Sequence, residues 1–185
     1  PPVTLDMDMK EADFSNKHLG VSGAIILAAF IKRKSFQDNG ALASLTFCGI
    51  LDGKEGPPIT INTTMIEADF SKKLGLEGAQ ILAAFIGRKF FQDNGALASA
   101  NLLRNNIGKE QIENLIKIKK EKGMISLCGL KEGQTEANFS NQGLEPEDAM
   151  FISLDIQDNG ALASLNMLRN YIGSEQAAAL IKIKH

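Results

Sequence analysis

The residues Leu162-Ala-Ser-Leu165-Asn-Met167-Leu-Arg-Asn170-Tyr-Ile172 are the clearest copy of a pattern that recurs along this chain. Leu97-Ala-Ser-Ala100-Asn-Leu102-Leu-Arg-Asn105-Asn-Ile107 is a second copy. In both, apolar and polar residues alternate, and such alternation predicts a short strand with one buried face. The asparagine that follows predicts a turn whose side chain caps backbone groups of the neighbouring coil.

Shorter blocks repeat elsewhere in the chain. Asp-Asn-Gly-Ala-Leu-Ala-Ser occurs at 38–44, 93–99 and 158–164, Glu-Ala-Asp-Phe-Ser at 11–15 and 67–71, Glu-Ala-Asn-Phe-Ser at 136–140, and Ile-Leu-Ala-Ala-Phe-Ile at 26–31 and 81–86. Self-similarity of this kind indicates supersecondary units that each bury a face against the next unit.

The first-quoted copy resembles the leucine-rich repeat, L-x-x-L-x-L-x-x-N-x-L. The Glu-Ala-Asp-Phe-Ser blocks fit this pattern with Phe at the central Leu, and Lys17, Lys73 and Gln142 stand where Asn is expected. Strand starts then fall near residues 9, 42, 65, 97, 124, 134 and 162, and several intervals of 27 to 33 residues leave room for a helix after each strand.

Repeats of this length resemble the helix-bearing, ribonuclease-inhibitor-like subclass of leucine-rich repeats. The resemblance implies an α/β fold: a right-handed leucine-rich-repeat solenoid, or horseshoe, of about seven short, mostly parallel strands with helices on the convex side. It also implies a single domain over residues 1–185 with degenerate repeats.

Helix signals occupy the long intervals. Helices are expected over residues 23–34, 109–122 and 174–184, and over a segment that begins near Pro146. Ser22 is expected to cap the first of these, and Gly123 to end the second. Proline suits the first turn of a helix, where its missing N–H costs nothing.

Two of the intervals between predicted strand starts are shorter than the others. Residues 51–64 contain Leu51-Asp-Gly-Lys-Glu-Gly-Pro-Pro and are expected to form an irregular loop or insertion. Only ten residues separate the strand starts at 124 and 134, so a tight turn is expected there instead of a helix.

Composition excludes several classes of function. The 185 residues are 44% hydrophobic and 23% charged, with a formal net charge of −2, so no nucleic-acid partner is expected. The longest apolar run covers residues 24–31, which is too short for a transmembrane segment. Two cysteines suit an intracellular, reducing compartment, cytoplasm or organelle, although a targeting sequence removed before Pro1 stays open.

The sequence motifs give no indication of catalysis. Neither histidine is placed to complete a zinc site with Cys48 or Cys128, and each cysteine precedes a glycine in its repeat, which favours a structural role. No nucleophile motif or phosphate loop stands in the required context. We therefore expect no enzyme activity, no cofactor, and no catalytic, cofactor-binding or metal-binding residues.

The remaining functional signal is the face that the predicted strands turn away from the core. By analogy with the horseshoe this face is concave, and it is polar and partly acidic. Its predicted partner-binding residues are Glu11, Asp13, Glu67, Asp69, Asn101, Glu136, Asn138 and Asn166.

The resemblance then implies a protein–protein interaction module or scaffold whose partner is another protein, basic or part of a multi-subunit assembly. Two alternatives stay open: a structural subunit built permanently into a larger complex, and a GTPase-activating or enzyme-inhibitor-type leucine-rich-repeat protein. Repeat duplication with solvated helix faces explains the charge pattern equally well without any function.

Overall fold

The computed structural model describes the chain except residues 1–3, 16, 39, 92–96 and 184–185. The chain divides into two compact units. Unit 1 contains residues 1–66 and 72–97, and unit 2 contains residues 67–71 and 98–185.

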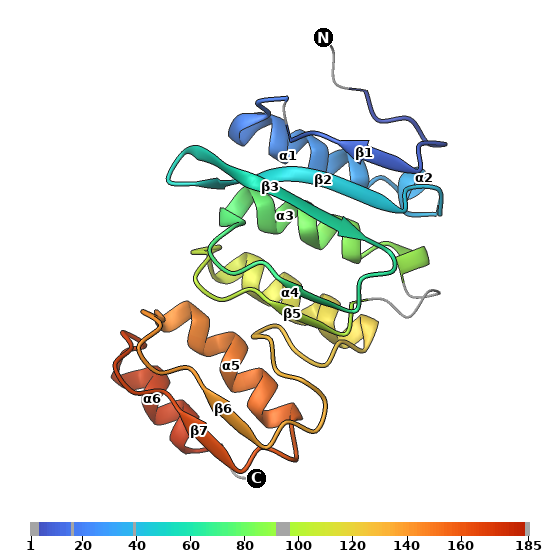
Figure 1. Cartoon of the computed structure of the whole chain (residues 1–185). Helices are drawn as coiled ribbons and strands as arrows, with labels where there is room; N and C mark the ends of the chain where they lie inside the picture. The colour runs from blue at the N-terminus through green and yellow to red at the C-terminus, as the bar shows by residue number, and fades with distance from the viewer. Residues whose placement is uncertain (1–3, 16, 39, 92–96, 184–185) are drawn as a thin grey trace. The chain divides into compact units, whose positions relative to one another are not determined.

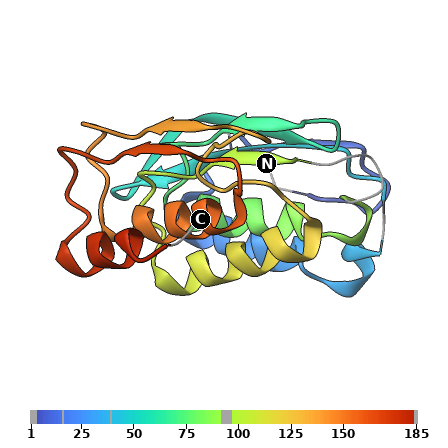
Figure 2. The same ribbon diagram turned by 90° about the horizontal axis from the view of Figure 1, so that it is seen from below.

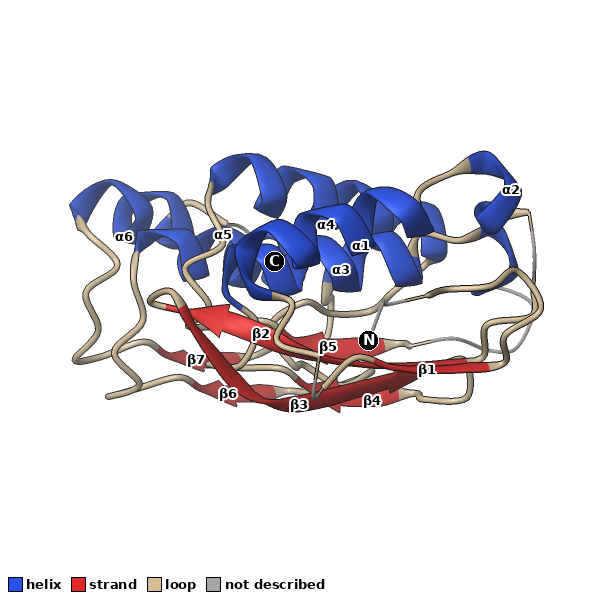
Figure 3. Cartoon of the chain, turned by 90° about the horizontal axis from the view of Figure 1, so that it is seen from above, coloured by secondary structure: helices blue, strands red, loops and turns tan. Residues whose placement is uncertain are grey.

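Unit 1 is a three-stranded sheet with helices on one face (Figure 1). Its elements are β1 Glu11–Asp13, α1 Gly20–Ile31, α2 Lys34–Gln37, β2 Ser44–Leu51, β3 Lys54–Asn62, α3 Gly75–Ile86 and a 3-10 turn at Lys89–Phe91. β1 runs parallel to β2, and β3 runs antiparallel to β2. Figure 3 shows α1 and α3 side by side on the same side of these strands.

The core of unit 1 follows the periodicities of its sequence. Leu45 and Phe47 of β2 are fully buried, while Thr46 between them is only half-buried. In α1 the buried residues are Ala24, Leu27, Ala28 and Ile31, which recur every three or four positions and form one helical stripe.

Arg88 ties the end of α3 to the sheet side of unit 1. Its side chain is only 2% exposed, and its guanidinium donates to the carbonyls of Leu42, at 2.7 Å, and Phe85, at 3.1 Å. The guanidinium carbon also lies 4.1 Å from the centre of the Phe85 ring. Burial lowers the pKa of Arg88 to about 10, so the group remains charged at neutral pH.

Arg33 occupies the same place after α1 as Arg88 does after α3, and it supplies a matched control because it is exposed. Arg88→Ala is expected to lower the free energy of unfolding by about 2–3 kcal/mol, since two buried carbonyls lose charge-assisted donors. Arg33→Ala should cost less than about 0.5 kcal/mol. Urea unfolding of the two variants tests this, and equal costs would contradict the anchoring role of Arg88.

Unit 2 has the same local order of strand followed by helix. Its elements are β4 Glu67–Asp69, β5 Ser99–Asn101, α4 Lys109–Lys122, β6 Glu136–Asn138, α5 Pro146–Asp158, β7 Ser164–Asn166 and α6 Ser174–Ile181. β4 pairs with β5 and β6 with β7, each in parallel and in separate two-stranded sheets. In Figure 2, α4, α5 and α6, in yellow, orange and red, lie on one side of these strands.

Asn105 and Asn170 cap backbone groups of the neighbouring strand segments, as the sequence predicted. Asn105 Nδ2 donates to the Phe70 carbonyl at 3.0 Å, and Asn170 Nδ2 donates to the Phe139 carbonyl at 2.8 Å. Asn170 Oδ1 also accepts from the N–H groups of Gln142 and Leu144, at 3.1 Å each. This local prediction is confirmed.

The helix predictions fare unevenly. Lys109–Lys122 is helical as expected, and Gly123 ends it in the left-handed conformation, at φ 65°. Pro146 lies in the first turn of α5, also as expected. The helix predicted over 23–34 begins at Gly20, so Ser22 lies inside its first turn and does not cap it.

The prediction of a right-handed horseshoe of about seven mostly parallel strands is wrong. The strands that the structure describes fall into one sheet of three and two sheets of two. One cause is β3, which fills most of the segment 51–64 that was expected to be an irregular loop. Asp52 and Gly53, at φ 50° and 75°, turn the chain sharply, and β3 then occupies the edge of β2 that a parallel strand would need.

The other cause is Asp155 of α5, which takes the backbone donors of the strand expected near 124. Asp155 is 1% exposed, and its Oδ2 accepts from Ser126 Oγ and from the N–H groups of Leu127 and Cys128, all at 2.7 Å. Only two isolated bridges, Ser99 to Ser126 and Asn101 to Cys128, remain.

A buried lysine balances this carboxylate. Lys119 Nζ lies 2.8 Å from Asp155 Oδ1 and 2.6 Å from Asp158 Oδ2. Burial alone would lower the pKa of Lys119, but the hydrogen bonds to the two aspartates outweigh it and raise the pKa.

Asp155→Ala is expected to cost about 3–5 kcal/mol of unfolding free energy, because it leaves the buried N–H groups of Leu127 and Cys128 without their acceptor and removes the buried one of the two carboxylates that neutralise Lys119. Asp158→Asn is the control: its carboxylate touches the same lysine but is half exposed, so its loss should cost about 1 kcal/mol or less. Amide hydrogen exchange should show lost protection at 126–128 in Asp155→Ala alone. Unchanged protection there would contradict this account.

Candidate functional site

The predicted partner-binding residues do lie at the outer face of the short strands. Glu11 and Asp13 are exposed on β1 of unit 1. In unit 2, Glu67, Asp69, Glu136 and Asn138 are exposed, while Asn101 and Asn166 are half-buried.

A glutamate lies opposite a serine three times. Glu11 is paired with Ser44, Glu67 with Ser99, and Glu136 with Ser164. Each glutamate is the first residue of its strand, so the repeated sequence produces a repeated surface arrangement in both units. Glu67 Oε2 also lies 3.2 Å from Lys131 Nζ, in an exposed ion pair.

The five Asp and Asn residues of the predicted set have a structural role that the sequence analysis missed. Each accepts, through its side-chain oxygen, the N–H group two residues further on, which forms an Asx turn at the end of its strand. The residues and distances are Asp13 2.8 Å, Asp69 3.0 Å, Asn101 3.2 Å, Asn138 3.0 Å and Asn166 3.1 Å.

The Asx turns explain why Asp or Asn occupies these five positions, so no binding partner is needed to account for them. The Ser15 backbone N–H holds the pKa of Asp13 below its ordinary value. The signal was visible in the sequence, since Asp and Asn at strand ends commonly form such turns. The three glutamates begin their strands and form no such turn in the described residues, and Glu67 makes the exposed ion pair with Lys131.

The surroundings of the two cysteines do not favour a reactive thiolate. Cys48 Sγ donates to the Ser15 carbonyl at 3.3 Å, and burial, together with the Asp155 charge, raises the pKa of Cys128 well above its ordinary value. A thiol held protonated is a poor nucleophile. Within the described part of the chain, no group of three His, Cys, Asp or Glu side chains is arranged to hold a metal ion.

A second surface, which the sequence analysis did not predict, is an apolar groove of about 800 Å³ between β7 and α6. We call it the β7–α6 groove. It is lined by Leu165, Asn166, Met167, Leu168, Arg169, Asn170, Ile172, Gly173, Ala177, Leu180 and Ile181.

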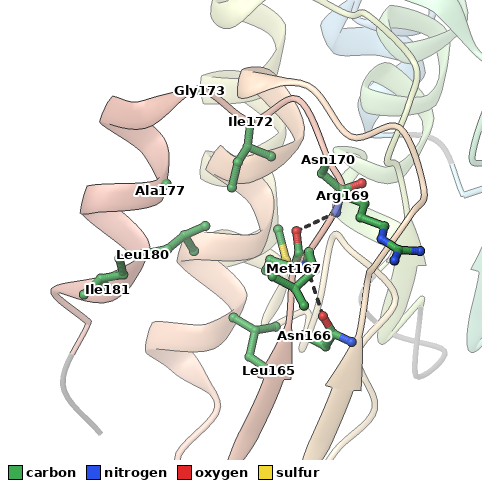
Figure 4. Close-up of a pocket in the computed structure, with 11 residues that line it drawn as sticks. Leu165, Asn166, Met167, Arg169, Asn170, Ile172, Gly173, Ala177, Leu180 and Ile181 are labelled. Carbon is green, nitrogen blue, oxygen red and sulfur yellow. Dashed lines mark hydrogen bonds between the residues drawn. The ribbon is translucent and has the colours of Figure 1, made fainter.

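The groove exposes side chains of a kind that a core would bury. Figure 4 shows Leu180 of α6 pointing toward Met167 across the groove, with Leu165 and Ile172 on the strand side. Ile181 is 85% exposed and Leu168 71% exposed. An apolar hollow of this size marks a docking surface more often than a solvated one. The signal in the sequence was the similarity to the copy at 97–107, whose apolar residues Ala100, Leu102, Leu103 and Ile107 are buried.

The chain matches no family model, no curated protein and no solved structure. None of the helices in the described residues is long and apolar enough to cross a membrane. The function of this chain must therefore be inferred from its own surfaces.

Proposed function

We propose that the protein is a protein–protein interaction module in which the outer faces of the short strands of each unit bind a basic partner. The observation that carries this proposal is the recurrence of an exposed glutamate, at Glu11, Glu67 and Glu136, at the start of three strands. Each stands beside a short serine on the next strand, which leaves the carboxylate accessible.

The charge pattern fits such a partner. Exposed charges at an interface act mainly on the association rate and on the choice of partner, because they steer the encounter before close contact forms. Acidic groups on strands and basic groups on helices, such as Lys117 and Lys120, would orient a basic protein toward the strands.

Resemblance to leucine-rich repeats is part of this proposal and is supported by Asn105 and Asn170, which cap neighbouring backbone as that repeat pattern requires. An intracellular, reducing location is also proposed, since Cys48 and Cys128 are both free thiols. Two alternatives stay predictions. One is a structural subunit of a larger complex, and the other is a GTPase-activating or enzyme-inhibitor-type protein, for which we identify no supporting residue.

A zero-length carbodiimide cross-linker in native extract tests the proposal, because it joins carboxylates only to lysine amines that touch them. Cross-links are expected from Glu67 and Glu136 to lysines of another protein. With that protein purified, Glu67→Gln combined with Glu136→Gln should weaken binding about tenfold, through slower association that salt also slows.

The control is Glu113→Gln combined with Glu121→Gln on α4. These two carboxylates are 60% and 56% exposed, against 56% for Glu67, so the loss of charge and the exposure are matched. Equal weakening by both pairs would mean that net charge, and not the strand face, attracts the partner. Cross-links confined to α4 would reject the proposal.

A further inference from the structure

We infer that the β7–α6 groove receives the β1–α1 coil, residues 9–31, of a second copy of this chain, so that copies associate head to tail. The inference rests on the apolar groove and not on the acidic strand face, so it stands or falls separately from the function proposed above.

The pairing has a precedent inside unit 2. There, the coil of residues 98–122 is followed by the coil of residues 134–158, and α4 packs against α5. The groove belongs to a second copy of the first coil: Asn101, Asn105 and Leu115 correspond to Asn166, Asn170 and Leu180.

Residues 9–31 are a second copy of the other coil. Glu11-Ala-Asp-Phe-Ser corresponds to Glu136-Ala-Asn-Phe-Ser, and Leu19, Ala24 and Ile31 correspond to Leu144, Ala149 and Ile156 without a gap. The chain therefore carries both partners of its own internal packing a second time, one near each end of the sequence.

The flank of α5 that faces α4 is fixed by the ion pairs of Lys119. Asp155 and Asp158 touch this lysine, and Phe151, one turn earlier on the same flank, is 2% exposed. The corresponding positions of α1 are Ile26, Phe30 and Arg33, and there Ile26 is 67% exposed. The same helix flank is thus covered in α5 and open in α1.

The groove side differs in the same way, because α4 is covered and its copy α6 is open. Ile112 and Leu115 of α4 are fully buried, whereas α6 has no buried residue. On the strand side, the N–H groups of Ala100 and Leu102 are covered by the segment that precedes the second coil, since they donate to the carbonyls of Ser126 and Leu127. Their counterparts, Leu165 and Met167, line the groove.

The chemistry of the two open surfaces is complementary. The internal contact between α4 and α5 has a buried ion pair, but α1 presents Ile26 and Phe30 where α5 has Phe151 and Asp155. The groove presents Leu180 and Ile181 on α6. An apolar contact of this kind is not weakened by salt, unlike the binding proposed for the strand face. Since the two surfaces differ, association is heterologous and extends to chains or rings.

Sedimentation velocity over a range of concentrations tests the inference. Wild-type protein should show dimers and larger species that persist at high salt. Ile26→Asp on α1 and Ile181→Asp in the groove should each weaken self-association roughly 30-fold or more, because each places a carboxylate in an apolar contact. Ile66→Asp is the control, since Ile66 is also exposed, at 62%, but lies on neither surface.

Mixing the two variants gives the sharpest result. Ile26→Asp keeps an intact groove and Ile181→Asp keeps an intact α1 flank, so a mixture should form dimers and nothing larger, although each variant alone is monomeric. Circular dichroism verifies that both are folded. A monomeric wild type, association that survives either substitution, or a mixture that stays monomeric would each overturn the inference.

Discussion

The backbone hydrogen bonds of very short strands are the constraint on which this structure depends. Five of the strands that the structure describes are three residues long, and such strands cannot satisfy the polar groups of the turns that flank them. Side chains do so instead. Asp13 and its counterparts close the turn after each short strand, and Asn105 and Asn170 bind the carbonyls of neighbouring strand segments.

One helix position shows how a repeated sequence diverges under this constraint. In α1 and α3 the position holds Phe30 and Phe85, each with an arginine over its ring. In α5 it holds Asp155, which binds three donors of residues 126–128 and pairs with Lys119. The phenylalanines and Asp155 occupy the same helix position, but only the aspartate can replace a strand's hydrogen bonds. Copies that look alike in sequence therefore do not make identical coils.

The dependence on particular side-chain contacts explains which features could be predicted from the sequence. The extent of α4, the place of Pro146 and the capping by Asn105 and Asn170 follow from local signals, namely helical periodicity, a first-turn proline and a turn residue after alternation. β3 could not be read in this way, because its proline and glycine content is typical of a loop and only pairing with β2 makes it a strand. The role of Asp155 depends on a contact between residues nearly thirty positions apart, so no local pattern reveals it.

The two repeat copies that contain Asn105 and Asn170, followed by α4 and α6, also show why the groove is unlike a solvated surface. A repeat that faces water generally carries a polar outer face. From α4 to α6, however, Glu113 and Asn114 are replaced by Ala178 and Ala179, so α6 as a whole is more apolar, not more polar, than α4, although these two alanines do not line the groove itself. The same reasoning applies to α1, where Ile25 stands in place of the Gln80 of α3. Both open coils have thus changed in the direction that a covered surface favours.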